Sequence, residues 1–131
     1  MQWLIDLIIE KIGIPPTYIY RGDPTEYDFN LGDFTVDYQW HPLDLSAIVP
    51  AGAKGVGISI VARPIAVPMD IQFRRGGQVD AYNWSGFMTK VAGNQQKETF
   101  MVACDENRIV DYRIETGGVS AMEVVIICWW L

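Results

Sequence analysis

The sequence contains few of the residues that usually carry metal or catalytic chemistry. It has one histidine, His41, and two cysteines, Cys104 and Cys128, among 131 residues. A structural zinc site takes four cysteine or histidine ligands, which normally come in close pairs such as C-x-x-C. The number of ligands therefore excludes a structural zinc site. We expect two free, buried cysteines that behave as small apolar side chains, with a disulfide between them as the alternative.

Basic charge is also scarce. The chain has 10 lysines and arginines against 16 acidic residues, a formal net charge of −6. A protein that binds the phosphate backbone needs a basic surface, so nucleic acid is not an expected partner. No apolar run is long enough to cross a bilayer, and residues 1–13 lack the basic leading region of a secretion signal. The sequence therefore predicts a soluble protein without a membrane partner.

Recognisable catalytic and cofactor motifs are missing as well. The glycines between Gly52 and Gly57 precede a predicted strand, whereas the glycines of a nucleotide fingerprint open a helix. Ser85 lacks the preceding glycine of a nucleophile elbow. We therefore expect no catalytic residue, no cofactor and no metal site.

Several acidic residues lie close together in the first half of the chain: Asp23, Glu26, Asp28, Asp33 and Asp37. Their spacing matches no calcium loop. A pair of catalytic carboxylates is recognised by its separation in space and not from sequence, so a small hydrolase stays open as the least favoured function. A solvated or partner-facing acidic surface is the preferred interpretation.

The charge is unevenly distributed along the chain. Residues 1–50 carry eight acidic side chains against two basic ones, whereas residues 51–131 carry eight of each. The second half is weakly charged and rich in aromatic residues. Because little electrostatic repulsion keeps copies of it apart, we expect this part of the chain to favour self-association.

Short alternating stretches separated by turns dominate the chain after residue 33. A period-two pattern predicts a strand from Phe34 to Trp40, and Gly55 and Gly57 predict a close backbone approach or a β-bulge. Further strands are expected at 56–60, 65–73, 99–104, 109–114 and 119–131. Such a series indicates an all-β fold, either an antiparallel β-sandwich or a barrel.

Arg21-Gly22-Asp23 spells a tripeptide that some cell-surface receptors recognise. It lies in a turn-rich stretch, residues 17–33, which we interpret as extended surface chain. A match of three residues is too short to indicate a function. We interpret it as a turn with a paired arginine and aspartate.

The N-terminal segment is strongly apolar. Residues 1–14 carry apolar side chains close to helical spacing, and Pro15 and Pro16 end any helix there. The segment is either a terminal helix that caps its own core or an arm that docks on a neighbouring subunit. Its candidate anchoring residues are Trp3, Leu4, Leu7, Ile8 and Ile12.

The last segment, residues 124–131, has no charged residue, and both of its alternating faces are apolar. In a regular strand, one face would carry Val124, Ile126, Cys128 and Trp130, and the other Val125, Ile127, Trp129 and Leu131. We expect one face in the core and the other against a second subunit or the N-terminal arm. A central strand covered on both faces within one chain is the alternative. Trp129 and Trp130 are candidates for the core or the subunit seam.

The string from Trp40 to Val56, WHPLDLSAIVPAGAKGV, resembles a group of small tailed-phage virion proteins. Phe73-Arg74, residues 102–105 and Trp129-Trp130 carry the same resemblance, which covers about residues 20–131. Proteins of this group are jelly-roll or related β-sandwich modules that serve as head fibres, capsid decorations or tail-associated fibres. The resemblance implies a non-enzymatic structural protein of the virion that assembles with itself, commonly as a homotrimer.

The expected organisation is an N-terminal attachment arm, residues 1–16, followed by one jelly-roll-like antiparallel β-sandwich, residues 17–131. Residues 1–14 fall outside the resemblance, and their apolar character suits attachment to capsid or tail proteins. The alternative function is a carbohydrate-binding or host-recognition module whose aromatic side chains stack on sugar rings. Tyr82 and Trp84 are the candidate stacking residues.

Overall fold

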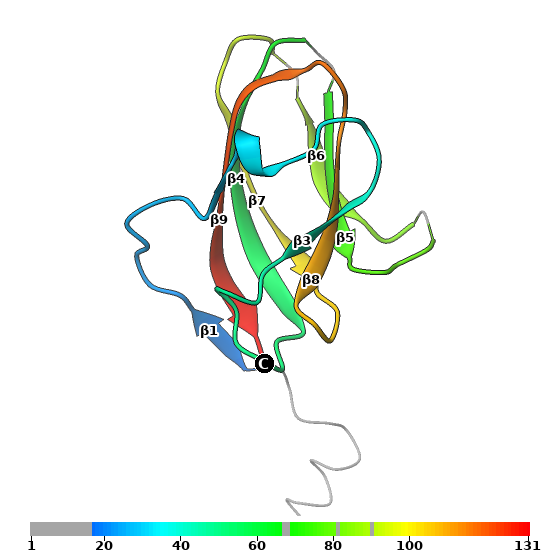
Figure 1. The fold of residues 1–131 in the computed structure, drawn as a ribbon. Helices are drawn as coiled ribbons and strands as arrows, with labels where there is room; N and C mark the ends of the chain where they lie inside the picture. Colours follow the sequence, from blue (N-terminus) through cyan, green and yellow to red (C-terminus); the bar gives the residue numbers. More distant parts are fainter. Residues whose placement is uncertain (1–16, 67–68, 81, 90) are drawn as a thin grey trace, which may run out of the picture.

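In the computed structural model, which describes residues 17–66, 69–80, 82–89 and 91–131, two antiparallel sheets pack face to face (Figure 1). Sheet A has the order β1-β9-β4-β7, with β2 also paired to β9, and sheet B has the order β3-β8-β5-β6. The strands of sheet A are β1 (Tyr18–Tyr20), β2 (Phe29–Asn30), β4 (Gly55–Pro64), β7 (Gln96–Ala103) and β9 (Val119–Trp130). Those of sheet B are β3 (His41–Asp44), β5 (Met69–Arg75), β6 (Ser85–Thr89) and β8 (Ile109–Ile114). The predicted all-β sandwich is confirmed.

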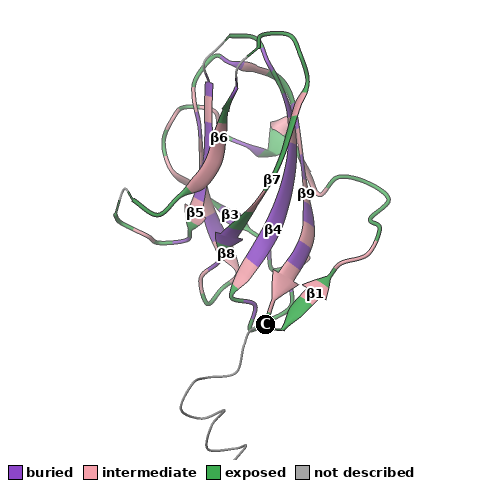
Figure 2. Ribbon diagram, turned by 180° about the vertical axis from the view of Figure 1, so that it is seen from behind, coloured by how far each residue is buried: buried purple, intermediate pink, exposed green. Residues whose placement is uncertain are grey.

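The core lies between the two sheets and is built from the inward positions of the long central strands. Ile58 and Ile60 of β4, Phe73 of β5 and Ile114 of β8 are completely buried. Figure 2 shows the same distribution, with buried positions along β4 and exposed ones on the short strand β1. The described residues contain no helix long and apolar enough to span a membrane.

The prediction of a strand from Phe34 to Trp40 is wrong. A short 3-10 helix, η1 (Leu31–Asp33), is followed by irregular chain, and the next strand starts only at His41. Tyr38 has a φ of 58°, a left-handed conformation that no strand residue adopts. The period-two pattern therefore reflects side-chain contacts made by a loop. Phe34 enters the core, while the rings of Tyr38 and Trp40 lie over arginines of sheet B.

Other predicted boundaries moved by a few residues. The strand expected at 65–73 is β5, which begins at Met69, because Ile65 instead donates its N–H to Gly118 O in a loop. The strand expected at 99–104 is β7, which begins earlier, at Gln96. The strands expected at 109–114 and at the C-terminal end are confirmed as β8 and β9.

The predicted bulge lies where β4 pairs with β9. Gly57 opposes Cys128 and Ile58 opposes Ile126, so Ile127 is an extra residue on β9. A β-carbon at Gly57 would collide with Cys128 Sγ, which occupies the space that the glycine leaves free. Gly57 is therefore a site of close approach, as the sequence predicted.

The bulge changes which side chains of β9 point inward, and it corrects the two faces predicted for this segment. Val124 and Ile126 belong to the core, and after Ile127 it is Trp129 that packs against the same core. Cys128 and Trp130 pair with Gly57 and Gly55 and share their outward side. Trp129 is therefore a core-contacting residue and Trp130 a surface residue.

Residues 1–16 lie outside the described residues. The predicted N-terminal helix or arm and its anchoring candidates, Trp3, Leu4, Leu7, Ile8 and Ile12, stay predictions.

Candidate functional site: the open face of sheet A

The outer surface of sheet A ends in two rows of uncharged residues, which we call the open face. Directly opposed residues of antiparallel strands point to the same side of a sheet, so the register gives each row across β1, β9, β4 and β7. The first row is Tyr18, Trp130, Gly55 and Ala103, and the second is Tyr20, Cys128, Gly57 and Met101.

Large apolar side chains on this face are exposed. Tyr18 is 54% exposed, Tyr20 59% and Met101 61%, and the ring of Tyr18 lies 5.5 Å from that of Trp130. Charge returns only towards the other end of the sheet, where Glu123 and Lys97 oppose Val61. The open face is therefore an apolar end of an otherwise mixed surface.

A shallow hollow of about 390 Å³ lies on the open face, and its lining is almost entirely apolar. It is lined by Lys54, Gly55, Met101, Val102, Ala103 and Trp130. Gly55 contributes no side chain, so the floor lies low between Trp130 and Met101. The one charged lining residue, Lys54, is exposed and sits at the start of β4.

Cys104 and Cys128 are both buried and free, which confirms the prediction from the sequence. Cys128 forms part of the floor of the open face above Gly57. Cys104 donates through Sγ to Ala53 O, and burial raises the pKa of its thiol. The raised pKa of Cys104 is the opposite of what a nucleophilic cysteine requires.

The edge of sheet A beside β9 is closed by a pair of side chains. Between β1 and β2 the chain does not pair with β9 as a strand. Here Arg21 Nη1 donates to Ile126 O over 3.0 Å, and Ile126 N donates to Asp28 Oδ2 over 2.8 Å. Arg21 and Asp28 also form an ion pair. Together they satisfy the backbone groups of β9 where no strand reaches them.

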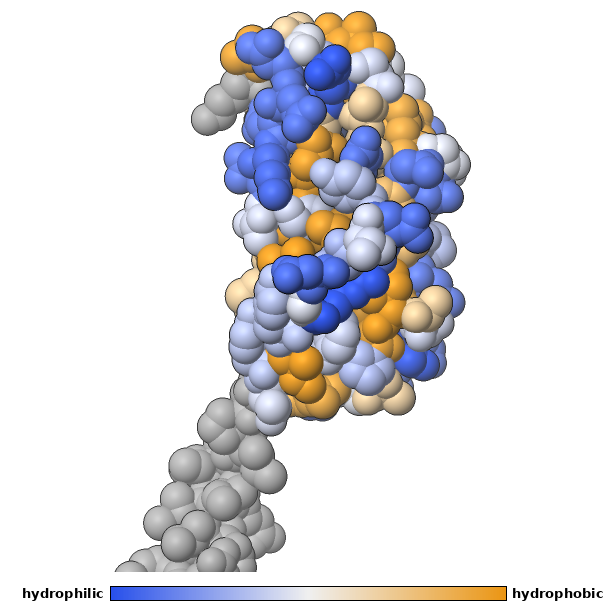
Figure 3. Space-filling view, turned by 90° about the vertical axis from the view of Figure 1, so that its left-hand side faces the viewer, coloured by the Kyte–Doolittle hydropathy of each residue, from blue (hydrophilic) through white to orange (hydrophobic). Residues whose placement is uncertain are grey.

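This pairing corrects the interpretation of the Arg21-Gly22-Asp23 tripeptide. The partner of Arg21 is Asp28, and Asp23 instead accepts a hydrogen bond from the Tyr20 hydroxyl. The guanidinium is held against β9 and is not offered to a receptor. Figure 3 looks onto this side of the molecule, where hydrophilic and hydrophobic patches alternate.

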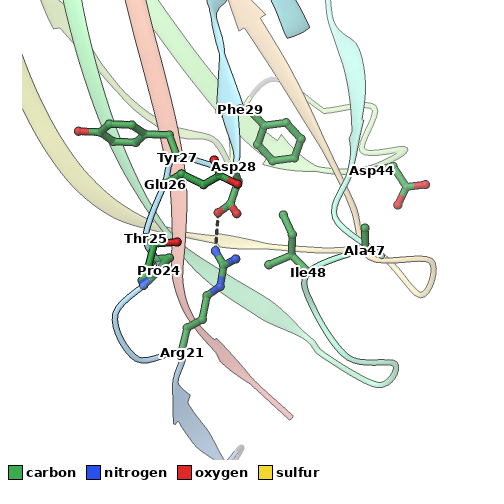
Figure 4. A pocket seen from close by; sticks show the side chains of 10 residues that line it. All are labelled: Arg21, Pro24, Thr25, Glu26, Tyr27, Asp28, Phe29, Asp44, Ala47 and Ile48. Atoms are coloured by element: carbon green, nitrogen blue, oxygen red, sulfur yellow. Dashed lines mark hydrogen bonds and ion pairs between the residues drawn. The ribbon is translucent and has the colours of Figure 1, made fainter.

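A pocket of about 460 Å³ lies between the residues 21–29 and 44–48 (Figure 4). Its acidic side chains are Glu26, Asp28 and Asp44. Asp28 is neutralised by Arg21, and hydrogen bonds from Ser46 lower the pKa of Asp44. A glycosidase needs one carboxyl with a raised pKa to act as the acid. The pKa of Asp44 is shifted in the opposite direction. Among the described residues, no group of three or more acidic, histidine and cysteine side chains could hold a metal ion.

The predicted stacking residues lie between β5 and β6, in residues 78–80 and 82–84, which we call the projecting loop. Tyr82 is 92% exposed, Trp84 45% and Val79 96%. Asp80 Oδ1 accepts hydrogen bonds from Tyr82 N and Gln78 Nε2, and Arg74 Nη1 donates to Asp80 O. Hydrogen bonds, chiefly from the Tyr82 N–H, lower the pKa of Asp80. The loop is therefore held in shape while its apolar side chains stay in solvent.

The outer surface of sheet B differs, because the chain covers it with its own loop. The guanidinium of Arg113 lies 4.6 Å from the ring centre of Tyr38 and 4.7 Å from that of Trp40, and Arg74 lies 4.0 Å from Trp40. Arg113 also donates twice to the buried Gln72. These contacts pair both arginines with aromatic rings of the same chain.

The structure separates the predicted site residues. Trp130 lies on the open face, Trp129 packs against the core, and Tyr82 and Trp84 lie on the projecting loop. Sequence reasoning missed Tyr18, Tyr20 and Met101. The signal that could have found them was the pairing of β1 and β7 with their neighbours, which period-two patterns do not reveal. A scan against models of protein families finds no match to this chain, and a search of curated proteins finds none.

Proposed function

We propose that this chain is a non-enzymatic structural protein that associates with copies of itself through the open face of sheet A. The observation that carries the proposal is the uncharged double row in which Tyr18, Tyr20 and Met101 are each more than half exposed. Exposed apolar area of this kind favours association at roughly 25 cal/mol per Å² removed from water. Residues 51–131 have a formal net charge of zero, which offers little repulsion against it.

The setting we propose is the virion of a tailed phage, as a head fibre, capsid decoration or tail-associated protein. The sandwich fold and the strings around Trp40–Val56 and Trp129-Trp130 support it, as does the apolar character of residues 1–14. In this function residues 1–14 attach the protein to capsid or tail proteins, and the sandwich forms a homotrimer. Deletion of residues 1–14 should leave a folded oligomer that no longer binds the particle. Unchanged binding would reject the attachment arm.

Self-association is tested by native mass spectrometry and sedimentation of the full chain over a range of concentrations. Met101→Glu and Trp130→Glu each place a charge on the open face and should convert the oligomer to a monomer. Met88→Glu is the matched control, because Met88 is 49% exposed but lies on sheet B. A wild-type protein that stays monomeric at high concentration would overturn the proposal, and so would an oligomer that both open-face variants leave intact.

A second candidate function is recognition of carbohydrate by Tyr82 and Trp84. The observation that favours it is their exposure on a loop held in shape by Asp80. Sugar stacking needs such aromatic faces together with free polar groups beside them. Glycan-array binding that is lost in Trp84→Ala and kept in Val91→Ala, a change at another exposed apolar residue, would support it. No binding to any glycan would remove it.

A further inference from the structure

The molecule carries two exposed apolar features of opposite shape. The projecting loop is convex, with Val79 and Tyr82 almost fully exposed, and the open face contains the hollow of about 390 Å³. Because Tyr82 is 92% exposed, the loop does not fill the hollow of its own chain. Among the residues that the structure describes, neither feature is covered by an apolar partner.

The two features lie at different places on the sandwich. In Figures 1 and 2 the loop between β5 and β6 extends away from the body on the side opposite β1. The hollow is on sheet A, between Trp130 of β9 and Met101 of β7. A contact between the loop of one copy and the hollow of another therefore joins two different surfaces, which makes it a heterologous contact.

Charge complementarity points to a second copy as the occupant of the hollow. The projecting loop carries a single charged residue, Asp80, and the hollow carries a single charged residue, Lys54. Both are exposed. Tyr82 of one copy and Trp130 of another can then be buried together, because the charges beside them, Asp80 and Lys54, are opposite in sign.

The loop is suited to docking because it is already ordered. Asp80 Oδ1 holds the backbone N–H groups of Tyr82 and Asn83 and the Gln78 amide, which leaves this oxygen no free position for a sugar hydroxyl. A preorganised loop loses little conformational entropy on binding. Its apolar tips therefore suit an apolar hollow better than a polar ligand.

We propose that the projecting loop of one copy seats in the hollow of the next copy, with Asp80 near Lys54, and that repetition of this head-to-tail contact closes a ring. The inference rests on the proposed self-association and assigns its geometry. Each interface of a heterologous contact uses the loop of one copy and the hollow of another. A copy with an impaired loop and a copy with an impaired hollow can therefore still form one intact interface between them.

The test mixes two full-length variants. Tyr82→Glu impairs the loop and keeps the hollow, and Met101→Glu impairs the hollow and keeps the loop. Each variant alone should be monomeric by native mass spectrometry, and an equimolar mixture should form a mixed dimer that grows no further. Lys54→Glu in the otherwise natural chain should weaken association about tenfold, with the loss reduced at high salt. Circular dichroism of each variant shows whether the sandwich remains folded.

The outcomes separate this inference from the function on which it rests. A monomeric wild-type protein removes both. A wild-type oligomer that Tyr82→Glu and Trp84→Glu leave unchanged overturns the loop contact alone, and so does a mixture of the two impaired variants that stays monomeric. Glycan binding that depends on Tyr82 while assembly does not would assign the loop to recognition and would likewise overturn it.

Discussion

The outer surfaces of the two sheets contrast in how their aromatic and charged groups are used. On sheet B, the loop before β3 lays Tyr38 and Trp40 over Arg113 and Arg74, so the chain itself covers the part of this face around these arginines. On sheet A, Tyr18 and Tyr20 stand exposed beside Met101 with no covering segment among the described residues. Aromatic residues near a sheet thus serve internal packing on one side and are left available on the other.

The contrast teaches that exposure, and not aromatic content, marks a candidate interface. Trp40 is only partly exposed because two arginines stack on it, and it contributes to the folded chain. Exposed apolar area on the open face does not stabilise the isolated chain. It stabilises an assembly in which another surface covers it. Substitutions on each face and a change of pH test this difference.

The largest effect is expected from Gly86→Ala in β6. A β-carbon there would collide with the backbone of β5 at Ile71 and Gln72, which cannot rotate away. We expect a loss of about 3 kcal/mol in the free energy of unfolding, measured by urea denaturation. Gly55→Ala on the open face is the control, because its β-carbon would lie 3.3 Å from Val102 O and should cost much less. Equal losses at both glycines would show that the two faces are equally tightly packed.

Arg21→Ala should cost about 2 kcal/mol, because it leaves Asp28 unpaired and Ile126 O without its donor. The side chain of Arg21 is 23% exposed, so solvent reduces the loss below that of a fully buried pair. Arg63→Ala is the control, since Arg63 is exposed on β4. Denaturation curves that coincide for the two variants would mean that the pair does not support the edge of sheet A.

Trp40→Leu should lower the free energy of unfolding by about 1 kcal/mol through loss of the stacked arginines, and it should leave self-association unchanged. Met101→Leu on the open face should leave both quantities nearly unchanged, because it keeps an apolar side chain of similar volume. Urea denaturation and sedimentation measure the two quantities. A change of oligomeric state in Trp40→Leu would break the contrast, because it would bring the covered face of sheet B into the assembly.

The smallest effect concerns pH and the projecting loop. The pKa of Asp80 is lowered in the folded chain, so its hydrogen bonds are complete above the ordinary pKa of an aspartate and are lost as pH falls through the lower folded value. The amide resonance of Tyr82 should shift over that acidic window and remain constant near neutral pH. Asp80→Asn keeps an acceptor oxygen without a titrating proton and should abolish the shift. A shift that persists in this variant would assign it to another group.

The pattern of turns and alternating residues was sufficient to predict much of the fold. Ile109 to Ile114 alternates between buried and part-exposed positions, as period-two spacing requires, and Gly57 permits the bulge that its missing side chain predicted. The same reasoning failed at Phe34 to Trp40. There the spacing is similar, but the bonds to β8, from Tyr38 N to Ile114 O and from Thr35 N to the Tyr112 hydroxyl, do not form the ladder of backbone pairs that defines a strand.

Local spacing also could not determine the candidate site. Trp129 and Trp130 are adjacent and chemically alike, yet one packs against the core and the other lies on the surface. The extra residue at Ile127 determines which of the two tryptophans points inward. Its effect depends on pairing with β4, which is distant in the sequence.

From the amino-acid sequence it follows that this chain forms β-strands separated by turns and that residues 124–131 are apolar on both alternating faces. Both follow from local composition and from the two-residue period of an extended backbone. Only the tertiary structure decided which side chains share a surface, since Tyr18, Met101 and Trp130 meet through hydrogen-bonded pairing between distant segments. Such pairing depends on the register of whole strands, and a single bulge is enough to reverse the side on which a residue lies.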